Sequence, residues 1–148
     1  MPSIQPIMKF IDSFTVTGVT VRTQNSDEFN KETAKLPNLW QQFHSNNPVI
    51  KTAIFSVYSD YESDANGPYS VTVGVANDNQ GTELHTVKVA SGNYFVFHGK
   101  GSMPQAVIET WERVWDYFIE GSLHQRCFIT DFEAYTNSDE VSIYIGVN

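Results

Sequence analysis

Two stretches of the chain, residues 54–75 and 128–147, repeat one pattern of residues. Each stretch begins with a strand-like run, passes through a polar turn and ends in a second strand with serine, glycine and valine in matching places. A tryptophan-containing segment precedes each stretch, at 39–43 and 114–118, and a run typical of β-strands comes before each of these. Because the matching segments occur in the same order, we infer two copies of a strand–helix–strand–strand unit.

The chain has 148 residues, enough for one domain with a sizeable core. We therefore predict a single domain over 1–148 whose half-repeats, at about 13–77 and 82–148, share that core. The expected class is α+β, with antiparallel strands, two main helices and a central cleft. Residues 1–12 are expected to be an irregular lead-in, and Pro37 is expected to kink or divide the first helix.

Glu133 lies in the middle of a predicted strand. Side chains alternate along 128–135, so Glu133 shares a face with Tyr135. An acid on a strand is usually solvated, but the aromatic neighbours and the apolar return strand favour a sheltered position. The matching residue of the first repeat, Ser59, is neutral, which makes the duplication asymmetric in charge. If the open faces of the halves meet, we expect a cleft lined by Tyr61, Thr72, Glu133, Tyr135 and Tyr144.

A carboxylate among aromatic rings is suited to an apolar cation. Each ring attracts a cation by about 0.5 to 2 kcal/mol, and a carboxylate neutralises the charge strongly where water is excluded. The return strand 141–147 divides into an apolar set, expected in the core, and a second set with Tyr144 on the face of the acid. Trp40, Trp111 and Trp115 follow helical apolar stripes, which favours a core role, and they are also candidates for the wall of the cleft.

Composition excludes several classes of function. A net charge of −8, from 17 acidic and 9 basic residues, argues against direct nucleic-acid binding. Cys127 is the only cysteine and the four histidines are scattered, so we expect no disulfide, metal or other cofactor. The N-terminus is too polar for a signal peptide and no apolar run could span a membrane, so a cytoplasmic location is expected.

The residues at 57–75, VYSDYESDANGPYSVTVGV, resemble the first-half hairpin of the GyrI-like superfamily. Residues 91–101, 111–115 and 131–135 resemble the second half of that superfamily in the same order. It comprises effector-binding domains, found attached to AraC-type and MerR-type transcription regulators and also as standalone proteins. The resemblance implies two SH2-like βαββ units around a ligand cleft, and a role for Glu133 as the buried acid that pairs with cationic, multidrug-like ligands.

The resemblance leaves three functions open. The first is a standalone binder of amphipathic cations that acts by sequestration or by signalling to a partner regulator, with Trp111, Tyr135 and Tyr144 as weaker transfers of ligand contacts. The second is an enzyme that hydrolyses reactive electrophiles, in which Glu133 activates water and Tyr135 orients the substrate. The third is an interaction protein that inhibits gyrase. Since no helix-turn-helix module fits before or after the domain, we favour the standalone binder.

Overall fold

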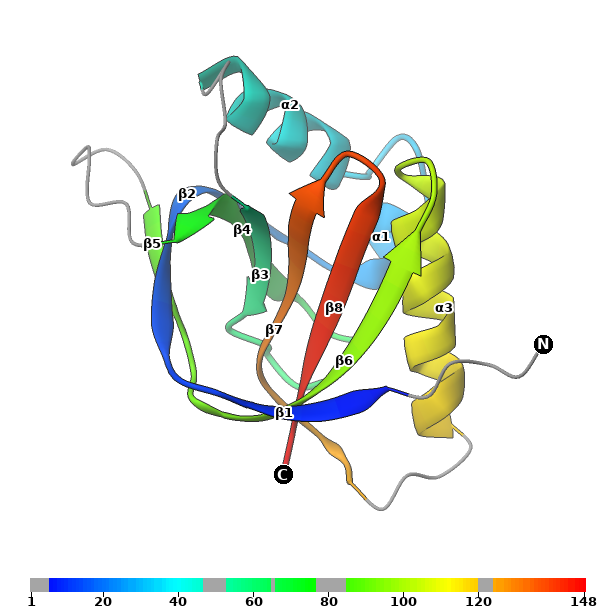
Figure 1. The fold of residues 1–148 in the computed structure, drawn as a ribbon. Coiled ribbons are helices and arrows are strands. Elements are labelled where there is room, and N and C mark those ends of the chain that lie inside the picture. Colours follow the sequence, from blue (N-terminus) through cyan, green and yellow to red (C-terminus); the bar gives the residue numbers. More distant parts are fainter. Residues whose placement is uncertain (1–5, 47–52, 65, 77–84, 120–123) are drawn as a thin grey trace.

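The computed structural model describes residues 6–46, 53–64, 66–76, 85–119 and 124–148 (Figure 1). Three helices accompany one antiparallel sheet of eight strands. The helices are α1 (Asn25–Glu28), α2 (Leu36–Asn46) and α3 (Gln105–Ile119). The strands are β1 (Ile7–Ile11), β2 (Phe14–Thr23), β3 (Ile54–Ser59), β4 (Tyr69–Ala76), β5 (His85–Val89), β6 (Gly92–Lys100), β7 (Arg126–Asn137) and β8 (Glu140–Val147). The predicted α+β class is confirmed, with one continuous sheet.

The strand order is symmetrical about the centre of the sheet. It reads β1-β6-β8-β7-β3-β4-β2-β5, so that β2, β4 and β3 of the first half mirror β6, β8 and β7 of the second. The two halves join where β3 pairs with β7, in a register that sets Val57 beside Phe132. This order is what two strand–helix–strand–strand units produce when the second strand of each unit, β3 or β7, pairs with the other across a common axis.

The outermost strands are exchanged between the halves. β1, which comes first in the chain, pairs with β6 of the second half, whereas β5 pairs with β2 of the first half. The expectation that residues 1–12 form an irregular lead-in is therefore wrong for residues 7–11, which gain hydrogen-bonding partners from β6. The boundary between the predicted half-repeats, around residues 77–82, lies outside the described residues.

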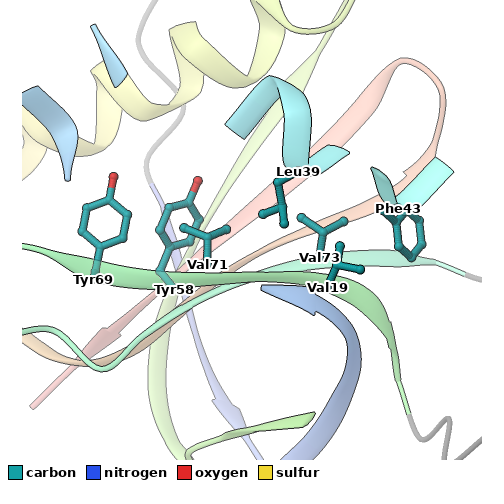
Figure 2. Packing of buried hydrophobic residues seen from close by; sticks show 7 residues of the cluster. All are labelled: Val19, Leu39, Phe43, Tyr58, Tyr69, Val71 and Val73. Carbon is teal, nitrogen blue, oxygen red and sulfur yellow. The ribbon is translucent and has the colours of Figure 1, made fainter. Parts of the chain in front are cut away.

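One face of the sheet carries both main helices. A cross-strand row on this face runs through Val19, Val73, Ser56, Glu133 and Ile143. At one end of the row, Leu39 and Phe43 of α2 pack in the same cluster as Val19 and Val73; Figure 2 shows this cluster. At the other end, Val114 of α3 packs in the same cluster as Ile143. Glu133 thus lies between two apolar clusters, beneath the helices.

The opposite face has its own core. It is built from Val16, Val57, Val89, Tyr94 and Phe132, which come from five different strands. The sheet is strongly curved (Figure 1), and these five side chains pack in one buried cluster. This second core rigidifies the central strands from behind, which fixes the position of the groups that they present to the helices.

The first helical region is divided into two helices, α1 and α2, as the presence of Pro37 led us to predict. α1 is a single turn and α2 begins at Leu36, so that Pro37 occupies the first turn of α2, where a proline costs no hydrogen bond. α1 begins after Gln24, and no side chain caps its first turn.

Candidate functional site

Glu133 is buried in the sheet with 3% of its surface exposed. Its Oε2 atom accepts hydrogen bonds from the Tyr58 hydroxyl at 2.7 Å and from Trp111 Nε1 at 2.6 Å. Its Oε1 atom accepts a hydrogen bond from the Tyr135 hydroxyl at 2.6 Å. All three donors are neutral, and among the residues that the structure describes no lysine, arginine or histidine forms an ion pair with Glu133. The carboxylate therefore has hydrogen bonds but no counter-charge.

The environment shifts the pKa values of this cluster upward. Burial raises the pKa of Glu133, although the hydrogen bonds from Tyr135, Trp111 and Tyr58 oppose that rise. Burial, reinforced by the nearby Glu133 charge, raises the pKa values of Tyr58 and Tyr135 well above the ordinary value of 10.0. Both tyrosines consequently remain neutral donors, and Glu133 is the group whose charge can change.

A cavity of about 520 Å³ opens beside Glu133. Its floor is the sheet, and its walls come from the α1–α2 region of the first half and from α3 of the second half. It is lined by Glu28, Phe29, Ala34, Leu36, Pro37, Trp40, Tyr58, Tyr69, Pro104, Val107, Ile108, Trp111, Glu112, Trp115, Glu133 and Tyr135. This set includes three glutamates and, within the described part of the chain, no basic side chain.

Aromatic rings pack around the carboxylate from both halves of the chain. Tyr135 meets Trp40 edge-to-face at a centroid distance of 5.0 Å, and Tyr58 meets Trp111 at 5.3 Å. Trp115 continues this wall beside Trp111 at 6.1 Å. The edge-to-face contacts fix the orientation of the rings, and a ring face that a ligand can reach attracts a cation through its quadrupole.

A second carboxylate, Glu28, organises the wall formed by the first half. Its Oε2 and Oε1 atoms accept hydrogen bonds from the backbone N–H groups of Lys35, at 3.0 Å, and Leu36, at 3.2 Å. Glu28 therefore caps the beginning of α2 from the preceding turn, where a negative charge also complements the helix dipole. The next residue, Phe29, is 75% exposed and its ring lies 6.2 Å from that of Trp115, so the two helical regions meet at the mouth of the cavity.

Residues 8–147 match the sequence model of the Cass2 family, described as integron-associated effector binding proteins. The chain belongs to this family. An integron cassette protein of Vibrio cholerae has a crystal structure that is 38% identical in sequence, with a TM-score of 0.88 over 97% of this chain and 96% of that one. YobU of Bacillus subtilis (strain 168), named as a candidate transcriptional regulator, is 27% identical over 147 residues, covering 88% of this chain and 89% of YobU.

More distant structures share the fold of the family. SAV2435, solved bound to tetraphenylphosphonium, is 20% identical and has a TM-score of 0.77 over 98% of this chain and 94% of that one. At this identity the similarity establishes the fold alone. The fold expected from the GyrI-like resemblance is thus confirmed, and the chain is a member of a family of effector-binding proteins.

Five of the residues singled out from the sequence of this family member lie together. Glu133, Tyr135, Trp111, Trp115 and Trp40 all line the cavity. The sequence favoured a core position for the three tryptophans. In the structure each of them lines the cavity and also packs against an apolar cluster. Because the helical stripes face the sheet directly above Glu133, residues on these stripes serve as core on one side and as cavity wall on the other.

The structure does not bring Tyr144 into the cavity. Glu133 pairs with Ile143, so that the apolar set of β8 faces the helices and Tyr144 faces the other way. Its ring stacks on Phe132 at 4.3 Å in the core of the opposite face. The expectation that Tyr144 shares the face of the acid is therefore wrong. A register shift between Tyr135 and Asn137 moves β8 by one residue relative to an unbroken hairpin, which exchanges its faces.

Tyr61, which was expected to line the cleft, is not among the residues that line the cavity, and it belongs instead to a second buried acidic cluster. Its hydroxyl donates to Asp131, which is fully buried and also accepts from Arg126, at 2.7 Å, and from the backbone of Gly146, at 2.8 Å. Arg126 and Asp131 form the only ion pair among the described residues. Unlike Glu133, Asp131 has a cationic partner in Arg126. Its role is therefore to hold β7 and β8 together rather than to pair with a charged ligand.

Two important residues of the site were not singled out from the sequence. Tyr58 and Tyr69 project from neighbouring strands with their hydroxyls pointing away from the sheet (Figure 2). Tyr58 binds Glu133, and Tyr69 donates to Asn25 Oδ1 at 2.5 Å, which ties α1 to the sheet. The feature of the sequence that could have pointed to Tyr58 is its place in β3, the strand that pairs with β7.

The described residues contain no group of three or more His, Cys, Asp or Glu side chains that could hold a metal ion. None of the helices in the same parts of the chain combines the length and apolarity that crossing a bilayer requires. At the cavity, the described residues supply a buried carboxylate, its three neutral donors and a largely aromatic wall.

Proposed function

We propose that this protein binds amphipathic organic cations in the aromatic cavity, with Glu133 as the counter-ion. The observation that carries the proposal is the state of Glu133: a carboxylate that is 97% buried by area, since only 3% is exposed, yet has no cationic partner among the described residues. An isolated buried charge is costly, and proteins normally pair it. A ligand that brings a positive charge into the cavity would remove this cost, and the surrounding rings would add their own attraction.

The three neutral donors support a binding role. They orient the carboxylate and lower the cost of keeping it ionised, so the site is organised before the ligand arrives. The cavity, at about 520 Å³, falls in the range of small-molecule sites, and its largely apolar lining suits the body of such a ligand. SAV2435, which shares the fold, is bound to tetraphenylphosphonium, and this makes that cation a suitable first probe.

A titration with tetraphenylphosphonium, followed by calorimetry and by tryptophan fluorescence, tests the proposal. We expect saturable binding with one site, quenching of the fluorescence of Trp111 and Trp115, and a loss of affinity of at least about tenfold in Glu133→Gln. The neutral analogue triphenylphosphine oxide should bind weakly and should be insensitive to the same substitution.

Glu112→Gln provides a matched control, because Glu112 lines the same cavity but is exposed. Its effect should be small and should disappear at high salt, since exposed charges are screened. If Glu133→Gln binds the cation as tightly as the wild type, or if the neutral analogue binds equally well, the assignment of Glu133 as counter-ion is wrong.

This chain belongs to a family of effector-binding proteins, and its relative YobU is named as a candidate regulator, so the biological output we propose is the reporting or sequestration of such a cation. A pull-down of cellular partners with and without a saturating cation tests this output. A partner captured in only one of the two states would indicate signalling, whereas identical captures would favour sequestration.

A further inference from the structure

The hydrogen-bonding capacity of Glu133 restricts which cations the proposed function can serve. A carboxylate offers about four acceptor directions, two on each oxygen. Tyr58 and Trp111 use both directions of Oε2, and Tyr135 uses one of the two on Oε1. About one direction is left for a ligand, although the negative charge of the group is undiminished.

Tyr69 and Glu28, which also line the cavity, are engaged as well. The Tyr69 hydroxyl donates to Asn25, and the oxygens of Glu28 accept from the backbone of Lys35 and Leu36. The hydroxyl oxygens of the tyrosines retain lone pairs, but a phenol is a weaker acceptor than a carboxylate. Glu112 is exposed, so water competes for its charge. The interior therefore combines a strong negative potential with few free acceptors.

This combination separates two classes of cation. A primary ammonium has three N–H donors and a guanidinium has five, and each donor buried without an acceptor costs about 1 to 3 kcal/mol. A quaternary ammonium, an N-alkylpyridinium or a phosphonium has no donor at its charged centre. Such an ion loses less on leaving water and still gains the attraction of the carboxylate and of the rings.

We propose that the cavity selects permanently charged organic cations without N–H groups over protonated amines and guanidines of the same size and shape. This inference rests on the proposed function and narrows its ligand class. The residues that set the preference are Tyr58, Tyr135 and Trp111, which occupy the acceptor sites of Glu133 and leave its charge available.

A matched pair of probes tests the preference. Trimethyl(2-naphthylmethyl)ammonium and 2-naphthylmethylammonium share one aromatic body and one charge, and differ in the N–H groups. Their Kd values are compared by calorimetry at a pH where the amine is fully protonated. We expect the trimethylammonium compound to bind at least about tenfold more tightly, because two of the three N–H groups of the amine would be buried without an acceptor.

Tyr135→Phe tests the physical reason. The substitution removes the donor to Oε1 and frees an acceptor direction, so the preference for the trimethylammonium probe should shrink by several-fold. Tyr58→Phe frees a direction on Oε2 and should act in the same sense, which keeps the test valid if one variant folds poorly. Tyr144→Phe, on the opposite face, should leave the preference unchanged.

The outcomes are distinguishable. If both probes bind with dependence on Glu133 but the amine binds as well or better, the selectivity is overturned and the proposed function stands. If the preference exists but neither Tyr135→Phe nor Tyr58→Phe reduces it, the acceptor-saturation mechanism is overturned. If neither probe binds, or if Glu133→Gln changes nothing, the proposed function and this inference both fall.

Discussion

Tyr58 donates a hydrogen bond of 2.7 Å to Glu133 across the junction of the two halves of the sheet. The two residues lie on the central strands β3 and β7 and face the helices together. Ser59, which the sequence repeat aligns with Glu133, pairs with Thr130, one position out of phase, and so lies on the other face. A twofold rotation about an axis normal to the sheet leaves each residue on the same face as its counterpart in the other half. Ser59 therefore does not occupy the place that corresponds to Glu133, and the residue of the first half that lies on the face of Glu133 is Tyr58, which binds it.

The ionisation of Glu133 is expected to cost the ligand-free protein stability. Because burial raises its pKa above the ordinary 4.5, the folded state binds the proton more tightly than the unfolded state does. The resulting stabilisation is complete below pH 4.5 and is lost as the pH rises through the raised pKa. Each pKa unit of elevation corresponds to about 1.4 kcal/mol.

Glu133→Gln mimics the protonated form and should therefore be at least as stable as the wild type at neutral pH, with the difference vanishing in acid. Chemical denaturation of both proteins at a series of pH values measures this. A variant that is clearly less stable than the wild type at neutral pH, but equal in acid, would show that the folded protein prefers the ionised carboxylate.

The affinity for a cation should fall in acid, in the opposite sense to the stability of the ligand-free protein. The ligand requires the ionised form of Glu133, so protonation competes with binding once the pH drops through the raised pKa. Below that pKa, Kd should increase about tenfold per pH unit. Tetraphenylphosphonium is the right probe because it does not titrate, and Glu133→Gln should remove the dependence. A Kd that stays constant through this range in the wild type would contradict the assignment.

Removing the charge of Glu28 should weaken the wall built by α2. Glu28→Gln loses a charged cap on the N–H groups of Lys35 and Leu36, and we expect a loss of about 0.5 to 2 kcal/mol in unfolding free energy. Because α2 supplies Trp40 to the cavity, the affinity for a cation should fall as well, though less than in Glu133→Gln. Glu32→Gln, an exposed acid in the same region, is the control. Equal effects of the two substitutions would refute the capping role.

Breaking the Arg126–Asp131 ion pair should destabilise the fold strongly. Asp131→Asn leaves the Arg126 side chain, which is 9% exposed, without its counter-charge. Breaking one partner of a buried pair costs about 3 to 5 kcal/mol, and urea denaturation should show a loss of this size. Asp116→Asn on the exposed side of α3 should change the midpoint little. A loss below about 1 kcal/mol for Asp131→Asn would indicate that Arg126 finds another way to be solvated.

The sequence predicted the fold class and the placement of an acid in a strand because these depend on period and order. It also led to Trp40, Trp111 and Trp115 through their helical spacing. Whether such a residue lines a core or a cavity depends on how closely two helices approach, which spacing does not determine. The structure places these rings at the gap between α2 and α3.

The face of Tyr144 could not be predicted, because it depends on one extra residue near the turn of the last hairpin. A single-residue slip reverses every side chain of a strand, so a small irregularity outweighs a long regular pattern. The role of Tyr58 was hidden for a related reason. It becomes a neighbour of Glu133 only when β3 and β7, which lie far apart in the chain, pair in one particular register.

The exchange of β1 and β5 bears on how such a chain could have arisen. The first half on its own would lose β5, which borders β2, and the second half on its own would lose β1, which borders β6. Each half would also lose its pairing partner at the centre of the sheet, where β3 meets β7. A shorter ancestor would have needed a second copy of itself to complete every hydrogen-bonded edge. Fusion into one polypeptide makes that assembly independent of concentration, and it frees one half to acquire a glutamate that a symmetric pair would have had to carry twice.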